Sequence, residues 1–130
     1  DDIKFSFNPF NLSSLTMAIG IAALADEGYF RACTSTICET RDRTRAELEA
    51  RGFTVLPGKA NFLFATHPTL GAAEWCGRLR KVGILTRHFA NPRTQNWLRI
   101  TVGTADEMDA FLLETDRILA HVEASLCLWL

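Results

Sequence analysis

The spacing of apolar residues changes at Gly52, and this change limits the folds open to the chain. Before Gly52, apolar side chains recur at helical intervals, whereas short apolar runs separated by turn residues follow it. Phe53–Leu56 and Asn61–Ala65 are predicted to be two extended segments joined by a Pro57-Gly58 turn. Helices combined with a few short strands predict a single α/β domain of two layers.

Two helices are predicted ahead of Gly52. Ser13 or Ser14 is expected to cap the first, which continues through Leu24. Asp26 begins a long second helix, and Gly52 ends it because glycine readily adopts the left-handed conformation found after a helix. An apolar stripe on the second helix is expected to face the core, and it consists of Phe30, Ile37, Thr44 and Leu48.

Two further helices and two strands are predicted after residue 66. Thr69 is expected to cap a helix that Gly83 closes, and its inward residues are Ala72, Trp75, Cys76, Leu79 and Val82. The extended runs are Ile84–Phe89 and Trp97–Val102, separated by the polar loop Ala90–Asn96. Thr104 and Glu107 form a capping box at the start of the last helix. Its buried face is expected to be Met108, Phe111, Leu112, Thr115, Ile118, Leu119 and Val122. The sheet is expected to be short and mostly antiparallel, covered by helices.

Charge and cysteine content exclude several classes of protein. A formal charge of −1 gives no reason to expect nucleic acid or an anionic membrane as a partner. The most apolar stretch, Leu15–Ala25, is shorter than the ~20 residues that cross a bilayer. The four cysteines have no close pairing, so neither a metal site nor a disulfide framework is expected. We expect buried free thiols in the reducing cytoplasm.

Two arginines interrupt apolar extended segments. Arg99 shares one face of its segment with Trp97 and Thr101, and Arg87 interrupts Ile84–Phe89. A guanidinium on an apolar strand needs a partner, because burying an unpaired charge is heavily penalised. Either a carboxylate of this chain pairs with it, or it binds an anionic ligand. A carboxylate or a phosphate suits the bidentate guanidinium fork.

Four segments of the chain resemble histidinol-phosphate aminotransferases. Leu98–Thr104, followed by Glu107, is similar to the segment L-R-I-T-V-G-T-x-x-E of that family. The other three are Pro9–Leu15, Lys59–Phe64 and Gly83–Arg87, similar to P-F-N-x-x-x-L, S-x-A-N-F-L and G-I-x-x-R. Their order matches, and they cover the chain from about Ile3 to Ala120. Residues 1–130 therefore resemble the C-terminal small domain of a class I/II, fold-type-I, pyridoxal-phosphate-dependent aminotransferase.

The resemblance implies a role for four residues. Arg99 would grip the anionic group of the substrate, a phosphate in the histidinol-phosphate branch, and Arg87 would assist. Asn61 would lie at the mouth of the site. The strap that contains Asn11 would line the cleft near the large domain and the partner of a homodimer.

The resemblance also implies a cofactor held elsewhere. Pyridoxal phosphate forms a Schiff base with a lysine of the family's large domain. Lys4, Lys59 and Lys81 match no such motif, so no catalytic residue is expected here and this piece alone is expected to be inactive. The apolar tail, residues 124–130, fits the family poorly and indicates an extra contact or an altered terminus.

The expected function is amino-group transfer between histidinol phosphate and 2-oxoglutarate, in histidine biosynthesis in the cytoplasm. Three alternatives remain open at this point: another class I/II aminotransferase, a threonine-phosphate decarboxylase, and a non-catalytic module that binds an amino acid or effector.

Overall fold

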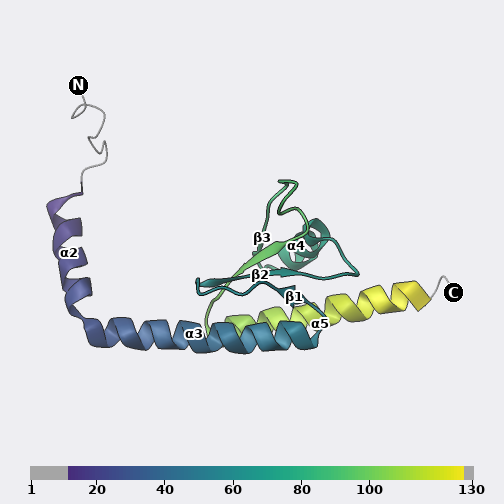
Figure 1. Cartoon of the computed structure of the whole chain (residues 1–130), viewed down its shortest axis with the longest axis horizontal. Coiled ribbons are helices and arrows are strands. Elements are labelled where there is room, and N and C mark those ends of the chain that lie inside the picture. Colours follow the sequence, from purple (N-terminus) through teal and green to yellow (C-terminus); the bar gives the residue numbers. More distant parts are fainter. Residues whose placement is uncertain (1–11, 128–130) are drawn as a thin grey trace, which may run out of the picture. The chain divides into compact units, whose positions relative to one another are not determined.

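The computed structural model describes residues 12–127 of the chain, with side chains described as far as residue 125. The elements, drawn in Figure 1, are α2 (Ser14–Ala25), α3 (Glu27–Ala50), β1 (Thr54–Val55), β2 (Phe62–Thr66), α4 (Ala72–Lys81), β3 (Arg87–His88), β4 (Leu98–Thr101) and α5 (Ala105–Cys127). They form two compact units, residues 1–34 and 35–130, and the boundary falls within α3. Asn11 lies outside the described residues.

Helix α2 of the first unit begins where the sequence predicts. The Ser13 hydroxyl oxygen accepts a hydrogen bond from the Thr16 amide at 3.2 Å, and Asp26 caps α3 by accepting from the Tyr29 amide at 3.0 Å. None of the residues of α2 is buried, although the helix is apolar on every side. Phe30, expected to face the core, is 61% exposed, so that prediction is wrong. An all-apolar helix normally lies in an interior, so this surface is suited to being covered.

The sheet of the second unit is antiparallel throughout, in the order β1-β2-β4-β3. In the central pair, Leu63 lies opposite Ile100 and Ala65 opposite Leu98, and all four side chains are buried. Their neighbours in each strand point to the other face, because side chains alternate along a strand. The alternation predicted around Arg99 in β4 is confirmed, and β2 shows the same pattern.

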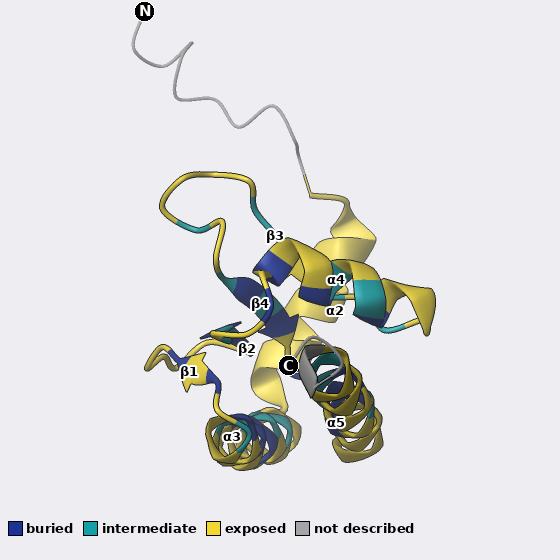
Figure 2. Ribbon diagram, turned by 90° about the vertical axis from the view of Figure 1, so that its right-hand side faces the viewer, coloured by how far each residue is buried: buried dark blue, intermediate teal, exposed yellow. Residues whose placement is uncertain are grey.

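Helices cover one face of this sheet, as Figure 2 shows for α4, α5 and the part of α3 from residue 35 onward. A single apolar core joins the layers, and its largest buried side chains are Trp75, Leu48, Leu63, Leu79 and Leu98. Ile37 packs against that core, and Thr44 and Leu48 are buried, as predicted. The predicted two-layer α/β architecture is therefore confirmed.

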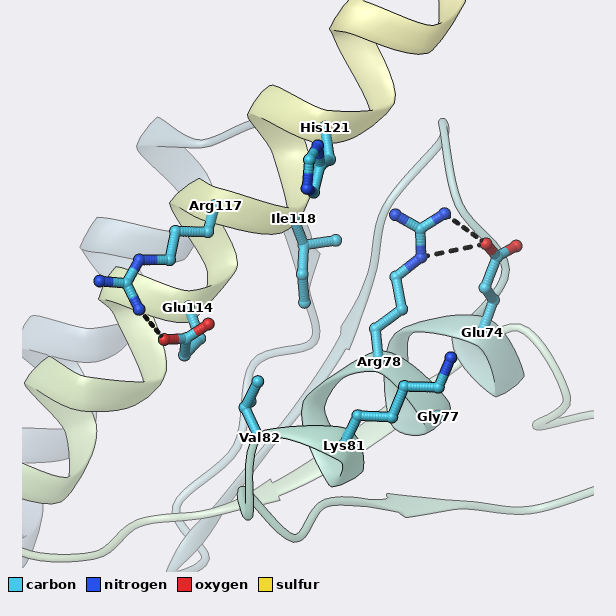
Figure 3. Close-up of a pocket in the computed structure, with 9 residues that line it drawn as sticks. All are labelled: Glu74, Gly77, Arg78, Lys81, Val82, Glu114, Arg117, Ile118 and His121. Atoms are coloured by element: carbon cyan, nitrogen blue, oxygen red, sulfur yellow. Dashed lines mark hydrogen bonds and ion pairs between the residues drawn. The ribbon is translucent and has the colours of Figure 1, made fainter.

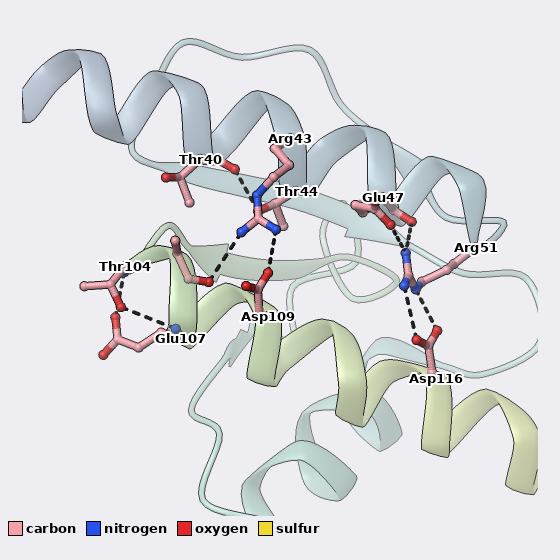
Figure 4. A network of polar contacts seen from close by, with 10 residues as sticks. Thr40, Arg43, Thr44, Glu47, Arg51, Thr104, Glu107, Asp109 and Asp116 are labelled. Atoms are coloured by element: carbon pink, nitrogen blue, oxygen red, sulfur yellow. Dashed lines mark hydrogen bonds and ion pairs between the residues drawn. The ribbon is translucent and has the colours of Figure 1, made fainter.

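Polar contacts fix the start of α5 and hold α3 against α5 (Figure 4). The predicted capping box is present: the Thr104 amide donates to Glu107 at 2.8 Å, and the Glu107 amide donates to the Thr104 hydroxyl at 3.3 Å. Arg51 at the end of α3 donates to both carboxylate oxygens of Asp116 on α5, at 2.6 and 3.1 Å. Gly52 has a φ of 84°, which explains why the helix ends there.

Three local predictions are wrong. Gly71, not Thr69, is the N-cap of α4, because the Thr69 hydroxyl bonds to the His67 ring at 2.8 Å within a turn. Val82 was predicted to point inward from this helix, but it is 53% exposed because it follows the last residue of α4.

The third concerns the cysteines. Cys38 is exposed and Cys33 is half-buried, so the expectation of buried thiols is wrong for these two, whereas the half-buried Cys76 packs against the core, as its predicted inward position requires.

Two further observations concern the helices. Residues 124 to 127 of the expected tail continue helix α5. Between residues 12 and 127, no helix is both long and apolar enough to span a membrane.

Candidate functional site

The face of the sheet away from the helices carries both predicted arginines. Arg99 on β4 lies opposite Phe64 of β2 on one side and opposite Arg87 of β3 on the other. Directly opposed residues of an antiparallel pair share a face, so the three side chains belong to one surface. The sequence-predicted pair Arg87 and Arg99 is thus brought together by the fold.

The Arg99 guanidinium is half-buried and lacks a carboxylate partner in the described chain. Its Cζ lies 4.4 Å from the centroid of the Phe62 ring, a cation–π geometry. Its Nε is buried and has no hydrogen-bond partner among residues 12–127. An unsatisfied buried donor costs about 1–3 kcal/mol, more when it is charged. The geometry therefore favours an anion that accepts from this guanidinium.

Arg87 adds a second positive charge beside it. Its Cζ lies 5.0 Å from the centroid of the Phe89 ring, and its side chain is exposed. Like charges placed directly opposite each other across two strands are destabilising. An anion shared by both guanidiniums would relieve this repulsion.

A hollow of about 920 Å³ opens beside Arg99. We call it the Arg99 hollow, and it is lined by Phe62, Phe64, Phe89, Asn91, Arg93, Thr94 and Arg99. The Phe64 ring is held by Trp97, which stacks on it with centroids 5.4 Å apart and planes inclined by 15°. The guanidiniums of Arg99 and Arg93 among aromatic walls suit a ligand that combines an anionic group with a flat apolar part, whereas Arg87 is not one of the lining residues.

The loop between β3 and β4 supplies a residue that the sequence did not single out. Arg93 lines the Arg99 hollow, and its amide donates to the Asn91 side-chain oxygen at 3.0 Å. The amides of Thr94 and Gln95 donate to the Asn91 carbonyl at 2.9 and 2.8 Å. The Asn91-Pro92 pair is the signal that could have predicted this turn, because asparagine side chains bond to backbone amides two residues on.

Asn61 is placed differently. Its carbonyl accepts from the Val102 amide at 2.9 Å at the end of the β2–β4 ladder, and its side chain is exposed. It is not one of the residues that line the Arg99 hollow.

A second hollow, of about 640 Å³, lies between α4 and α5 (Figure 3). Its two carboxylates are already neutralised, because Glu74 accepts from Arg78 and Glu114 accepts from Arg117, each pair on one helix. The Arg99 hollow differs in that its guanidiniums have no such described partner. We therefore take the Arg99 hollow as the candidate site. Within residues 12–127, no group of three His, Cys, Asp or Glu side chains could hold a metal ion.

Comparison with known proteins assigns the family. Residues 3–114 match the family described as aminotransferase class I and II. The chain belongs to this family, and its resemblance to histidinol-phosphate aminotransferases is confirmed as follows. It is 46% identical over 110 residues to the histidinol-phosphate aminotransferase of Chromohalobacter salexigens, covering 85% of this chain and 31% of that protein. The chain thus spans about a third of the length of the curated relatives it matches.

Solved structures share the fold. The histidinol-phosphate aminotransferase of Clostridium acetobutylicum superposes with a TM-score of 0.76 at 24% identity, covering 86% of this chain and 35% of that one. The enzyme of that name from Sinorhizobium meliloti, in complex with pyridoxal-5'-phosphate, gives a TM-score of 0.71 at 27% identity, covering 96% and 34%. The second unit is therefore a small domain of the aminotransferase fold.

Proposed function

We propose that this chain is the substrate-binding portion of a pyridoxal-phosphate-dependent aminotransferase acting on histidinol phosphate and 2-oxoglutarate. The observation that carries the proposal is the half-buried Arg99 side chain, which lines the aromatic hollow and forms no ion pair with a described carboxylate. The names of the relatives support the choice of substrate. Such an enzyme takes part in histidine biosynthesis in the cytoplasm, and we extend that expectation to this protein.

Arg99 is proposed to bind the anionic group of the substrate, assisted by Arg87. A guanidinium can donate two parallel hydrogen bonds to a phosphate or a carboxylate, which fixes the orientation of the group as well as its position. The Phe62 and Phe64 rings flank the same hollow and suit the flat imidazole ring of histidinol phosphate. Holding both parts of the substrate orients its amine for reaction and so lowers the entropic part of the barrier.

The described lysines lie away from the candidate site. Lys59 and Lys81 are exposed, and neither lines the Arg99 hollow. Pyridoxal phosphate supplies an electron sink when bound. We propose that a large domain of the same enzyme holds it and that residues 1–130 alone are inactive. We also propose that the intact enzyme is a homodimer, with Asn61 near the mouth of the site and Asn11 in the cleft.

Replacing Arg99 by lysine in the full-length enzyme tests the proposal. Lysine keeps the charge but loses the two-pronged contact, so KM for histidinol phosphate should rise about 10- to 100-fold, as expected for hydrogen bonds to a charged group. Cofactor affinity should stay unchanged. Arg80→Lys is the matched control, because Arg80 is exposed on α4 and is not a residue of the Arg99 hollow. A loss of cofactor affinity at constant KM would contradict the assigned role.

The choice of substrate needs its own test. The full-length enzyme should turn over histidinol phosphate faster than aromatic amino acids, measured with 2-oxoglutarate as the amino acceptor. Preference for aromatic amino acids would indicate another class I/II aminotransferase, and release of carbon dioxide from threonine phosphate would indicate a decarboxylase. Absence of any turnover, with retained binding of an amino acid, would favour a non-catalytic module.

A further inference from the structure

Besides Arg99, a second guanidinium lines the Arg99 hollow, and it comes from the loop between β3 and β4. Arg93 lines the same hollow as Arg99 but comes from residues outside the sheet. Its side chain is exposed, and no described carboxylate forms an ion pair with it. The hollow therefore has one positive group in its wall at the sheet and another at the loop.

The backbone that carries Arg93 is fixed by local hydrogen bonds. Asn91 accepts from three successive amides, those of Arg93, Thr94 and Gln95. The Gln95 carbonyl is in turn 2.8 Å from the His88 ring nitrogen on β3, and the Trp97 amide donates to the Thr94 carbonyl at 2.9 Å. A loop held at both ends costs less entropy when it engages a ligand than an unstructured one. Only the side chain of Arg93 then has to move.

We infer that Arg93 is a further substrate-binding residue, which contacts the anionic group from the solvent side and favours phosphate over carboxylate. The inference rests on the proposed function. A phosphate monoester carries about −1.5 to −2 charges at pH 7 and three acceptor oxygens, whereas a carboxylate carries −1 and two. Arg99 and Arg87 suffice for a carboxylate. A phosphate dianion has a second negative charge and a third acceptor oxygen that those two arginines do not pair with. Arg93 is placed to donate a hydrogen bond to that oxygen.

The test compares Arg93→Gln with Arg80→Gln in the full-length enzyme loaded with pyridoxal phosphate, so that the cofactor's own phosphate site is filled. Arg93→Gln should raise KM for histidinol phosphate about tenfold, equivalent to ~1.4 kcal/mol. The inhibition constant of inorganic phosphate should rise by a similar factor. KM for 2-oxoglutarate, which carries only carboxylates, should change less than twofold. Arg80→Gln should leave all three values unchanged.

Arg93→Lys separates a binding role from a structural one. Lysine keeps the positive charge, so it should recover most of the affinity for histidinol phosphate and inorganic phosphate. A lysine variant as impaired as the glutamine variant, with a lowered Tm, would mark a role in loop structure and overturn the inference. Equal losses for histidinol phosphate and 2-oxoglutarate would also overturn it.

The outcome for Arg99 keeps this inference distinct from the proposed function. If Arg99→Lys raises KM for histidinol phosphate and Arg93→Gln does not, only the role of Arg93 is refuted. If Arg99→Lys has no effect on KM, the proposed function fails with it.

Discussion

The two faces of the four-stranded sheet differ in what their side chains contact. On one face, Leu98 and Ile100 are 1% and 2% exposed and pack beneath α4 and α5. On the other, Arg99 lies between them in the same strand, where its guanidinium stacks over the Phe62 ring and lines the Arg99 hollow. A shift of one residue along β4 therefore separates a side chain that stabilises the fold from one available to bind a ligand.

This division implies that stability and binding can be changed independently. Large-to-small changes on the covered face leave a cavity, so their main effect falls on the free energy of unfolding. Changes on the open face remove groups that line the hollow, so their main effect falls on KM. Pairs of neighbouring residues offer direct tests.

The largest effect is expected for Leu63→Ala, compared with Phe64→Ala. Leu63 is 1% exposed in the core, so its truncation should lower the free energy of unfolding by about 2–5 kcal/mol in urea denaturation. Phe64, one residue later, is half-buried in the wall of the Arg99 hollow. Phe64→Ala should therefore lower the free energy of unfolding by only about 1 kcal/mol. Only Phe64→Ala should raise KM for histidinol phosphate. Similar losses of stability for both variants would show that the two faces are not distinct.

A smaller effect is expected for Thr104→Ala, at the cap of helix α5. The change removes the hydroxyl that accepts from the Glu107 amide, and loss of such a cap costs about 1 kcal/mol. Because α5 lies on the covered face, KM should remain that of the unchanged enzyme. Thr104→Ser serves as the control, since serine restores the acceptor and should restore the unfolding midpoint.

The Phe64–Trp97 stack is expected to contribute a similar amount. Aromatic pairs of this geometry contribute about 0.5–1.5 kcal/mol beyond the area they bury. A double-mutant cycle with Phe64→Leu and Trp97→Leu measures that coupling by chemical denaturation. The same variants should raise KM, because the stack holds one wall of the hollow. A coupling energy of zero would remove Trp97 from the description of the site.

The smallest effect is expected for the pair Arg51 and Asp116 between α3 and α5. Asp116 and then Glu47 raise the pKa of Arg51 above its ordinary value, so this guanidinium keeps its charge at any pH used for folding measurements. Partly exposed pairs contribute about 0.2–1 kcal/mol, which a double-mutant cycle with alanine at both positions would measure. The coupling should shrink in 1 M salt and leave KM unchanged. A coupling that salt does not reduce would contradict an electrostatic origin.

The sequence predicted the elements whose determinants are local. The cap at Ser13, the end of α3 at Gly52 and the capping box of α5 each depend on residues within a few positions of one another. Alternation around Arg99 was visible for the same reason. Such features can be predicted without knowledge of tertiary contacts.

Features that depend on tertiary contacts were missed or misplaced. Thr69 was predicted to be a helix cap, but its hydroxyl is hydrogen-bonded to the His67 ring, and the helix begins after Gly71. Arg93 was overlooked because a polar loop shows no periodicity, and only the fold brings it beside Phe62 and Phe64. Phe30 fitted the stripe of its helix, yet the described residues provide nothing that buries it.

The register that places Arg87 opposite Arg99 has a consequence for the rim of the sheet. Strand β3 has only two residues, and its ladder sets two positive charges face to face. An anion bound between the two guanidiniums would attract both and offset their repulsion. Binding of the anion and pairing of β3 with β4 would then be thermodynamically linked. At a hundredfold excess of ligand over its Kd, such linkage amounts to about 2.7 kcal/mol. Slower hydrogen exchange of the β3 backbone amide that donates to β4 would then report the arrival of a substrate before any chemistry takes place.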